Sequence, residues 1–173
     1  MTTLAGAPKL SDLGEFRSVL AAGGDVAKAA RFAVQINKVG VLPDLHFLCE
    51  AAEFPARALN AQNYRYYGPD FKLPHQTQYT DLNLTFICRT KMQEKVFFDK
   101  WMDEINPRNT YDFNFRNTYA CDIVIYQYAE TGEATYLNTF LEAYPINVNA
   151  IPTSWAEDNF QRLQVTFAFT EWK

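Results

Sequence analysis

Residues 160–172 have the sequence FQRLQVTFAFTEW, in which apolar and polar side chains alternate. The apolar face would carry Leu163, Val165, Phe167 and Phe169. The polar face would carry Arg162, Gln164, Thr166 and Thr170. A period of two residues is typical of a β-strand with one buried and one solvated face. The segment therefore predicts a final strand that ties the end of the chain into a sheet.

The residues before this strand indicate how the chain reaches it. Tyr144-Pro145 and Ile151-Pro152 mark an extended connection, because a residue that precedes proline avoids the helical region. We expect the final strand to pair with residues 135–142, the preceding strand-like run.

Several earlier segments also predict strands. In residues 79–89 (YTDLNLTFICR), Leu82, Leu84 and Phe86 alternate with polar residues. Residues 30–41 and 46–52 would form a hairpin around a turn at residues 42–44. Residues 122–128 (DIVIYQY) are apolar on both faces, which predicts a cover on each side, either a second layer or another subunit. A turn at residues 130–133 would lead to their partner, residues 134–143.

Two helices are expected. Thr90 and Gln93 have the form of a capping box, and the helix that follows carries one apolar stripe and stops at Asn106-Pro107. The stripe consists of Phe97, Phe98, Trp101, Met102 and Ile105. Residues 11–22 would form a shorter amphipathic helix that ends at Gly23-Gly24.

Two stretches lack a clear period. Residues 53–78 contain Pro55, Pro69 and Pro74 and read as a long loop with a partner-binding role, although residues 63–67 could form a short strand. The alternative is a loop that folds over the protein's own core. Residues 109–120 read as a connection.

These elements predict a mainly β fold. We expect a two-sheet β-sandwich or partial barrel of six to seven strands, with one packed amphipathic helix. Residues 1–173 would form a single domain, with residues 1–29 as an N-terminal extension.

The composition narrows the class of function. The chain has 16 Lys and Arg against 20 Asp and Glu, a formal charge of −4, which argues against a protein that grips nucleic acid phosphates. Three cysteines without a C-x-x-C spacing predict neither a disulfide framework nor a zinc site. The sequence shows no signal peptide and no apolar run long enough for a membrane helix, so we expect no membrane insertion by this chain. Its aromatic content of 16% favours a β protein that buries surface against copies of itself.

Nothing in the sequence indicates catalysis. It contains no P-loop, G-x-S-x-G or H-E-x-x-H motif. His46 and His75 have no metal-ligand spacing to a cysteine or carboxylate, and Cys49 and Cys88 lie in strand-like segments where cysteine acts as a small hydrophobe. We expect no enzyme activity, no metal and no cofactor.

The order of these segments resembles the tail tube proteins of contractile-tailed bacteriophages. The similar landmarks are ARFAVQI, FLCEAAEFPA, LNLTFICR, KVFFDKWMDEI, DIVIYQY and the closing YPINV to FTEWK. The resemblance implies a homohexamer, in which six subunits join their sheets into one continuous β-barrel. Rings would stack into an inner tail tube through which DNA passes into the host.

The same resemblance implies partners and a location. A contractile sheath would surround the tube, baseplate and tail terminator proteins would meet its ends, and DNA would cross the lumen without specific binding. The protein would be made in the host cytoplasm and become part of the virion tail. The tubes of type VI secretion and contractile injection systems, and the baseplate tube-initiator proteins, remain alternatives.

Two sets of residues are candidates for these roles. The candidates for the lumen are Asp81, Asn83, Thr85, Gln164 and Thr166, which lie on the polar faces of predicted strands. The candidates for contacts between rings are Tyr64, Arg65, Tyr66, Tyr67 and Phe71. From a different class of function, a monomeric β-sandwich module could grip a carbohydrate or peptide with this same aromatic segment.

Overall fold

We analysed a computed structural model of the chain, which describes residues 18, 22, 26–156 and 159–173. The helix expected over residues 11–22 lies outside these residues, apart from Ser18 and Ala22. No helix among the described residues is long and apolar enough to cross a membrane.

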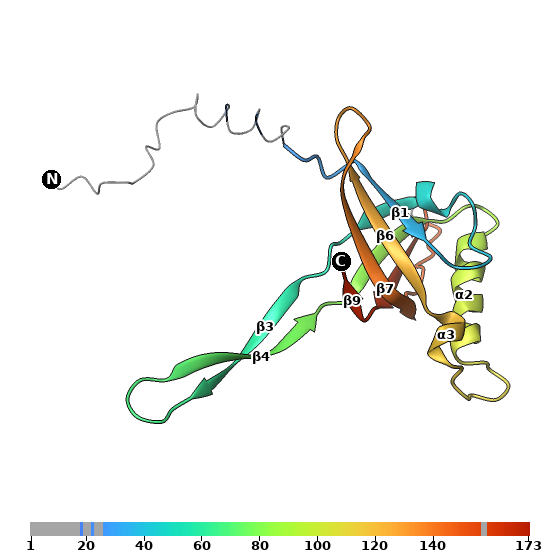
Figure 1. Cartoon of the computed structure of the whole chain (residues 1–173). Helices are drawn as coiled ribbons and strands as arrows, with labels where there is room; N and C mark the ends of the chain where they lie inside the picture. The colour runs from blue at the N-terminus through green and yellow to red at the C-terminus, as the bar shows by residue number, and fades with distance from the viewer. Residues whose placement is uncertain (1–17, 19–21, 23–25, 157–158) are drawn as a thin grey trace.

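The main body is a sheet of seven antiparallel strands in the order β1-β6-β7-β8-β5-β2, with β9 beside β7 (Figure 1). The strands are β1 (Phe32–Ile36), β2 (Cys49–Ala52), β5 (Leu82–Ile87), β6 (Cys121–Tyr128), β7 (Ala134–Val148), β8 (Arg162–Ala168) and β9 (Glu171–Trp172). A mainly β fold is therefore confirmed.

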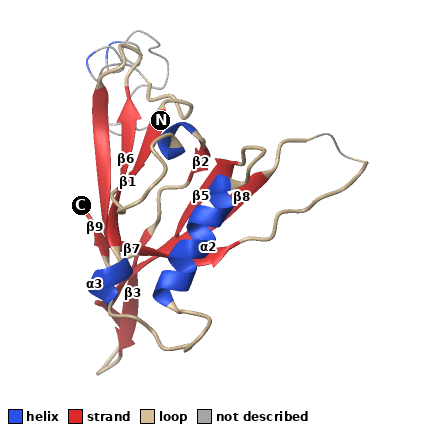
Figure 2. Cartoon of the chain, turned by 90° about the vertical axis from the view of Figure 1, so that its right-hand side faces the viewer, coloured by secondary structure: helices blue, strands red, loops and turns tan. Residues whose placement is uncertain are grey.

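The strand β7 divides this sheet into two halves. Its residues 134–143 pair with β6, and its residues 144–148 pair with β8. At the change of partner, Glu142 has a left-handed backbone with φ of 53°, and its amide donates to the carboxylate of Asp122 at 3.1 Å. The sheet bends there, so its two halves face each other across the core (Figure 2).

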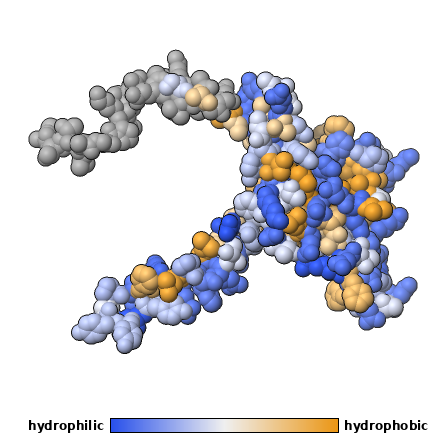
Figure 3. Space-filling model, viewed as in Figure 1, coloured by the Kyte–Doolittle hydropathy of each residue, from blue (hydrophilic) through white to orange (hydrophobic). Residues whose placement is uncertain are grey.

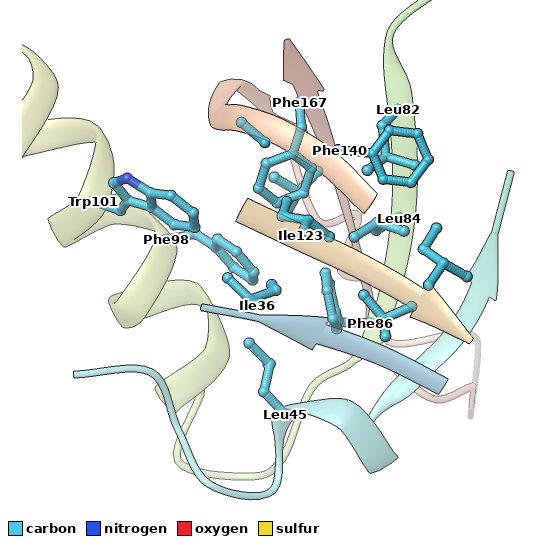
Figure 4. Packing of buried hydrophobic residues seen from close by; sticks show 14 of the residues in the cluster. Ile36, Leu45, Leu82, Leu84, Phe86, Phe98, Trp101, Ile123, Phe140 and Phe167 are labelled. Carbon is cyan, nitrogen blue, oxygen red and sulfur yellow. The ribbon is translucent and has the colours of Figure 1, made fainter. Parts of the chain in front are cut away.

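The helix α2 (Gln93–Ile105) lies against the core face of β5 and β8 (Figure 2). Its buried Phe98 and Trp101 pack beside Phe167, with ring centroids 6.0 and 5.9 Å away (Figure 4). The indole of Trp101 donates to the carbonyl of Tyr119 at 2.9 Å. This bond attaches α2 to the short helix α3 (Arg116–Tyr119).

Several sequence predictions are confirmed. Leu82, Leu84 and Phe86 are buried on β5, and Leu163, Val165 and Phe167 are buried on β8. On β6, Ile123 and Ile125 point into the core, while Val124 is buried on the opposite face. The turn at residues 130–133 joins β6 to β7, with Gly132 at a φ of 87°.

The pairing of the strands differs from the prediction. β1 pairs with β6 and β2 pairs with β5, so the expected hairpin between them is wrong. Between β1 and β2 the chain forms the short 3-10 helix η1 (Leu45–Phe47) and crosses from one half of the sheet to the other. β8 pairs with residues 144–148 of β7 and with β5. Of the predicted final strand, only its last residues, which form β9, pair within residues 135–142, at Phe140 and Leu141. Tyr144-Pro145 therefore belongs to a strand and not to a connection.

The start of α2 also differs from the sequence prediction. Thr90 does not cap the helix, because Met92 occupies the N-cap position with a left-handed backbone and no side-chain cap bond forms. The carboxylate of Glu94 instead accepts the backbone amide of Arg89 at 3.1 Å. The capping box is thus wrong, although the helix and its apolar stripe are confirmed.

The largest difference concerns residues 53–78, which form a hairpin rather than a loop. Its strands are β3 (Arg57–Tyr64) and β4 (Phe71–Tyr79), and among the described residues they pair only with each other. The hairpin extends away from the body (Figure 1), and nearly all of its residues are exposed. It therefore does not fold over the protein's own core. The described part of the chain contains nine strands, more than the six or seven expected.

Candidate assembly surfaces

The first candidate surface is the polar face of β5 and β8. The register places Asn83 opposite Thr166 and Thr85 opposite Gln164. The hydroxyl of Thr166 donates to the side-chain carbonyl of Asn83 at 2.9 Å. Their neighbours in sequence, Leu84 and Val165, point into the core, because successive side chains of a strand alternate between its faces. The structure thus brings together four of the five predicted lumen residues.

This polar face continues onto β7 through residues that the sequence reasoning missed. Asn149 donates to the side chain of Gln164 at 2.7 Å, and Asn147 donates to Asn149 at 2.6 Å. Asn147 also lies opposite Thr166 in the register. The spacing of Asn147 and Asn149 by two residues would place both side chains on one face of a strand. Pro145, however, favoured a connection rather than a strand at this point.

The charges on this face are partly neutralised. Arg162 binds Glu50 across β8 and β2, with Nη2 and Oε1 2.9 Å apart. The hydrogen bond from Arg162 lowers the pKa of Glu50, and Glu50 in turn raises the pKa of Arg162. Glu53 accepts a hydrogen bond from Asn83 at 3.3 Å. The face therefore combines amides and hydroxyls with a small excess of negative charge.

Asp81 is the fifth predicted lumen residue and stands apart from this network. It lies just before β5 and is exposed. Within the described residues, its carboxylate forms no ion pair or hydrogen bond. Asp81 therefore adds a free negative charge close to the polar face.

The second candidate surface is the tip of the β3–β4 hairpin. Tyr64 and Phe71 lie opposite each other where the two strands end, and Arg65, Tyr66 and Tyr67 lie in the turn between them. Tyr66 and Tyr67 are fully exposed. The structure thus brings all five predicted ring-contact residues together.

The base of the hairpin is attached firmly to the body. Ala56 and Thr80 exchange hydrogen bonds of 2.8 and 3.0 Å. Pro55 is buried, and the ring of Tyr79 lies 5.8 Å from that of Phe169 and 6.3 Å from that of Trp172. The base therefore sets the direction of the hairpin, while nearly all residues of its two strands stay exposed to a partner. Figure 3 shows one face of the hairpin projecting from the body.

The reactive side chains of the described residues give no indication of a metal centre or an activated cysteine. No group of three or more His, Cys, Asp or Glu side chains that could hold a metal ion occurs within the described residues. Burial raises the pKa of both Cys49 and Cys121 to about 12. The thiolate that a cysteine nucleophile requires is therefore scarce at neutral pH.

Known structures share this fold. The chain is similar to a protein in the sheath-tube complex of PVC, an extracellular contractile injection system, with 17% identity and a TM-score of 0.65 over 86% of this chain and 90% of that one. It is also similar to a chain of the PVC sheath/tube terminator, with 16% identity and a TM-score of 0.67 over 86% and 95% of the two chains. A chain of the tube-terminating cap of the anti-feeding prophage has 18% identity and a TM-score of 0.66 over 86% and 89%.

Sequence comparison gives the family. No curated protein sequence matches the chain. Residues 20–173 match the family described as "Phage tail tube protein". Since the match covers nearly the whole sequence, the chain belongs to the phage tail tube protein family.

Proposed function

We propose that this protein is the structural subunit of the inner tube of a contractile tail. Six copies form a ring, and rings stack into a tube inside a contractile sheath. Baseplate and terminator proteins meet the two ends of the tube. In a phage tail the tube conducts DNA into the host, and in an injection system it conducts another cargo.

The β3–β4 hairpin is the observation that carries this proposal. A two-stranded hairpin is at best marginally stable in water when it buries no face, and here nearly every residue of both strands is exposed. Its tip concentrates tyrosines and an arginine, the residue types that dominate protein interfaces. A contact with a neighbouring ring would cover the hairpin and give these residues a role.

The free edges of the main sheet support the same proposal. Within the described residues, β1 and β2 each pair on one side only. An exposed edge is a template for pairing with another chain. Joining such edges between neighbouring subunits would close six copies into one barrel, which has no free edge.

The polar face of β5, β8 and β7 is our candidate for the channel wall. It lies on the side of the sheet away from α2, and its amides and hydroxyls remain in contact with water. A wall with few positive charges would let DNA pass without sticking, because each basic contact strengthens binding to phosphates.

Negative-stain electron microscopy of the purified protein over a range of concentrations tests this proposal. We expect hexameric rings with a central channel, and tubes at higher concentration or after seeding with baseplates. A protein that stays a monodisperse monomer at high concentration, even when seeded, would contradict it. That outcome would favour the monomeric binding module instead.

A further inference from the structure

The chain between β7 and β8, residues 149–161, presents two aromatic side chains to solvent. We call this segment the β7–β8 loop. Trp155 is fully exposed and Phe160 is 78% exposed. Large exposed aromatic residues mark protein contacts, and tryptophan is enriched at the energetic centre of protein interfaces. The loop is therefore a candidate contact with a partner protein.

A hollow of about 280 Å³ lies in this loop. Ile151, Pro152 and Phe160 give its wall apolar surface, and four polar residues of the same loop complete most of the wall. Arg162 borders the hollow, and its charge is paired with Glu50. Typical small-molecule pockets measure about 300–1,000 Å³, so this smaller hollow suits a single side chain. A wall of mixed polarity fits tyrosine, which combines an apolar ring with a polar hydroxyl.

The β7–β8 loop and the β3–β4 hairpin leave opposite ends of the same two strands. Leu82, the first residue of β5, lies opposite Phe167, and Ile87, the last residue of β5, lies opposite Arg162. The hairpin leads into β5 at Leu82, whereas the loop leads into β8 at Arg162. Figure 2 shows β3 and this loop projecting on opposite sides of β5 and β8. One copy therefore carries exposed aromatic residues at both ends of its polar face.

The tip of the hairpin does not reach the β7–β8 loop of its own copy. The six residues of β5 separate the two ends of the sheet by about 20 Å. The eight residues of β3 carry the tip about 25 Å further from the body (Figure 1). In a closed barrel the strands are inclined by about 35–45° to the axis. The two ends of β5 and β8 would then lie toward opposite rims of the proposed ring.

The hairpin and the β7–β8 loop carry opposite charges. The hairpin contains Arg57, Arg65 and Lys72 against Asp70. The sequence of the loop contains two acidic residues and no basic one. Lys91, which follows the same end of β5, offsets only one of these charges. Opposite charges favour the encounter of the two segments when they belong to different copies.

We infer that the hairpin tip of one copy binds the β7–β8 loop of a copy in the next ring. One of the exposed tyrosines, Tyr66 or Tyr67, occupies the hollow, and Trp155 and Phe160 contact the rest of the tip. Two different surfaces of the same chain meet, and such a head-to-tail contact repeats at each new ring and leaves the tube open-ended. This inference rests on the proposed function and names the surface that receives the hairpin.

Mixing two assembly variants of the full chain tests the contact. The tip variant is Tyr66→Ser/Tyr67→Ser, and the loop variant is Trp155→Ser/Phe160→Ser. We expect each variant alone to form single rings and no tubes in negative-stain micrographs. A mixture of the two kinds of ring should give stacks of two rings and nothing longer. The intact tips of the loop variant bind the intact loops of the tip variant, and both outer ends of such a stack carry a damaged surface.

A matched control comes from exposed aromatic residues outside both surfaces. Phe113 and Phe115, between α2 and α3, are 76% and 89% exposed. We expect Phe113→Ser/Phe115→Ser to form tubes of the same length as the parent protein. Circular dichroism of all three variants checks that each one keeps the fold.

The outcomes separate this inference from the proposed function. Full-length tubes from the folded loop variant, or a mixture that contains only single rings, would overturn the inference and leave the tube function standing. A folded loop variant that stays monomeric while the parent forms rings would place the contact within a ring, which also overturns the inference. A parent protein that never assembles would overturn both.

Photo-crosslinking gives a second measurement that leaves the loop unchanged. A benzophenone amino acid replaces Tyr66, and the protein is irradiated as tubes and as a dilute monomer. We expect covalent dimers in the tubes only, with the crosslinked peptide containing residues 149–161. The same amino acid in place of Phe113 is the control, and we expect no link from it to that peptide. Tubes whose residue 66 crosslinks only to other peptides would overturn the inference.

Discussion

Glu94 is a fully buried carboxylate at the start of α2. It accepts hydrogen bonds from Nε of Arg89 at 2.6 Å and from the amide of the same residue at 3.1 Å. Arg89 in turn reaches Asp44 at 3.4 Å. One side chain thus connects the end of β5, the start of α2 and the segment before η1. Burial alone would raise the pKa of Glu94, but the hydrogen bonds from the backbone and from Arg89 hold it below its ordinary value of 4.5.

We predict that Glu94→Gln destabilises the protein in a pH-dependent way. A carboxyl group whose pKa is lowered in the folded state stabilises that state above its unfolded pKa, and the contribution is lost as the pH falls through the folded pKa. The free energy of unfolding should drop by about 1.5–3 kcal/mol at pH 7, the range for a hydrogen bond to a charged group. The difference between the two proteins should shrink below pH 4.5.

Urea unfolding of both proteins at neutral and acid pH measures this effect. Asp99→Asn is the control, because Asp99 forms only a partly exposed pair with Lys95 on the same helix, which is worth about 0.3–0.5 kcal/mol. An equal difference between parent and Glu94→Gln at both pH values would contradict the role assigned to the charge.

The helix α2 is the element that closes the core of one copy. Trp101 is its largest buried side chain, and its ring contacts Phe97, Phe98 and Phe167. We predict that Trp101→Ala lowers the free energy of unfolding by about 3–5 kcal/mol, because it leaves a cavity and an unpaired carbonyl on Tyr119. The neighbouring Lys100 is exposed, and Lys100→Ala should change stability by less than about 0.5 kcal/mol. Denaturant unfolding compares the two, and a similar small effect from both would show that α2 does not seal the core.

The hairpin is the element that we assign to contacts between rings. We predict that Tyr66→Ser/Tyr67→Ser leaves the fold intact and suppresses tube growth, since it removes interface area without touching the main sheet. Arg65 forms a long, exposed ion pair with Asp70 at 4.0 Å, and the other donors of its planar guanidinium suit a carboxylate of the next ring.

Circular dichroism, thermal melting and tube length in micrographs test the hairpin. Asn60→Ser/Gln76→Ser is the matched control, because these exposed residues lie opposite each other on the same hairpin but away from its tip. Full-length tubes from a normally folded tip variant would contradict the assignment.

The sequence predicts the strands that bury one face against the core. It does not predict the β3–β4 hairpin, whose strands bury neither face. Leu82, Leu84 and Phe86 alternate with polar residues because one side of β5 meets the core. In the hairpin both faces meet water, so nothing in a single copy imposes alternation on residues 57–64. Gly68-Pro69, between two runs of similar length, was the remaining signal of a turn.

At the scale of the whole molecule, strand pairing was the least predictable feature. β7 changes partner at Glu142, whose left-handed backbone is unusual for a residue with a side chain. Pro145 lies within the same strand, against the general depletion of proline in strands. Pro145 reads as an interruption in the sequence, whereas nothing in the sequence marks Glu142, which lies inside a predicted strand. Four of the five predicted lumen residues, Asn83, Thr85, Gln164 and Thr166, still lie together on one face, because strand alternation fixes the face of each side chain whatever the pairing.

The bent sheet has two sides, and the proposed tube requires that one of them face a channel. We predict that Gln164→Cys lies inside that channel. In a monomer the exposed residue 164 should react with both a small maleimide and a maleimide attached to a bulky polymer. In a tube it should react only with the small one, because the polymer cannot enter the bore. Asn117→Cys on α3, which is exposed and does not belong to the polar face, should react with both reagents in either form.

The three natural cysteines interfere little with labelling at residue 164. Cys49, Cys88 and Cys121 are partly buried, and burial raises the pKa of each thiol. They therefore react slowly near neutral pH, and the parent protein gives the background. Gel shifts of monomers and purified tubes count the labelled subunits. Full labelling of Gln164→Cys tubes by the bulky reagent would place the polar face on the outer wall, and the channel would then have to be sought on the opposite side of the sheet.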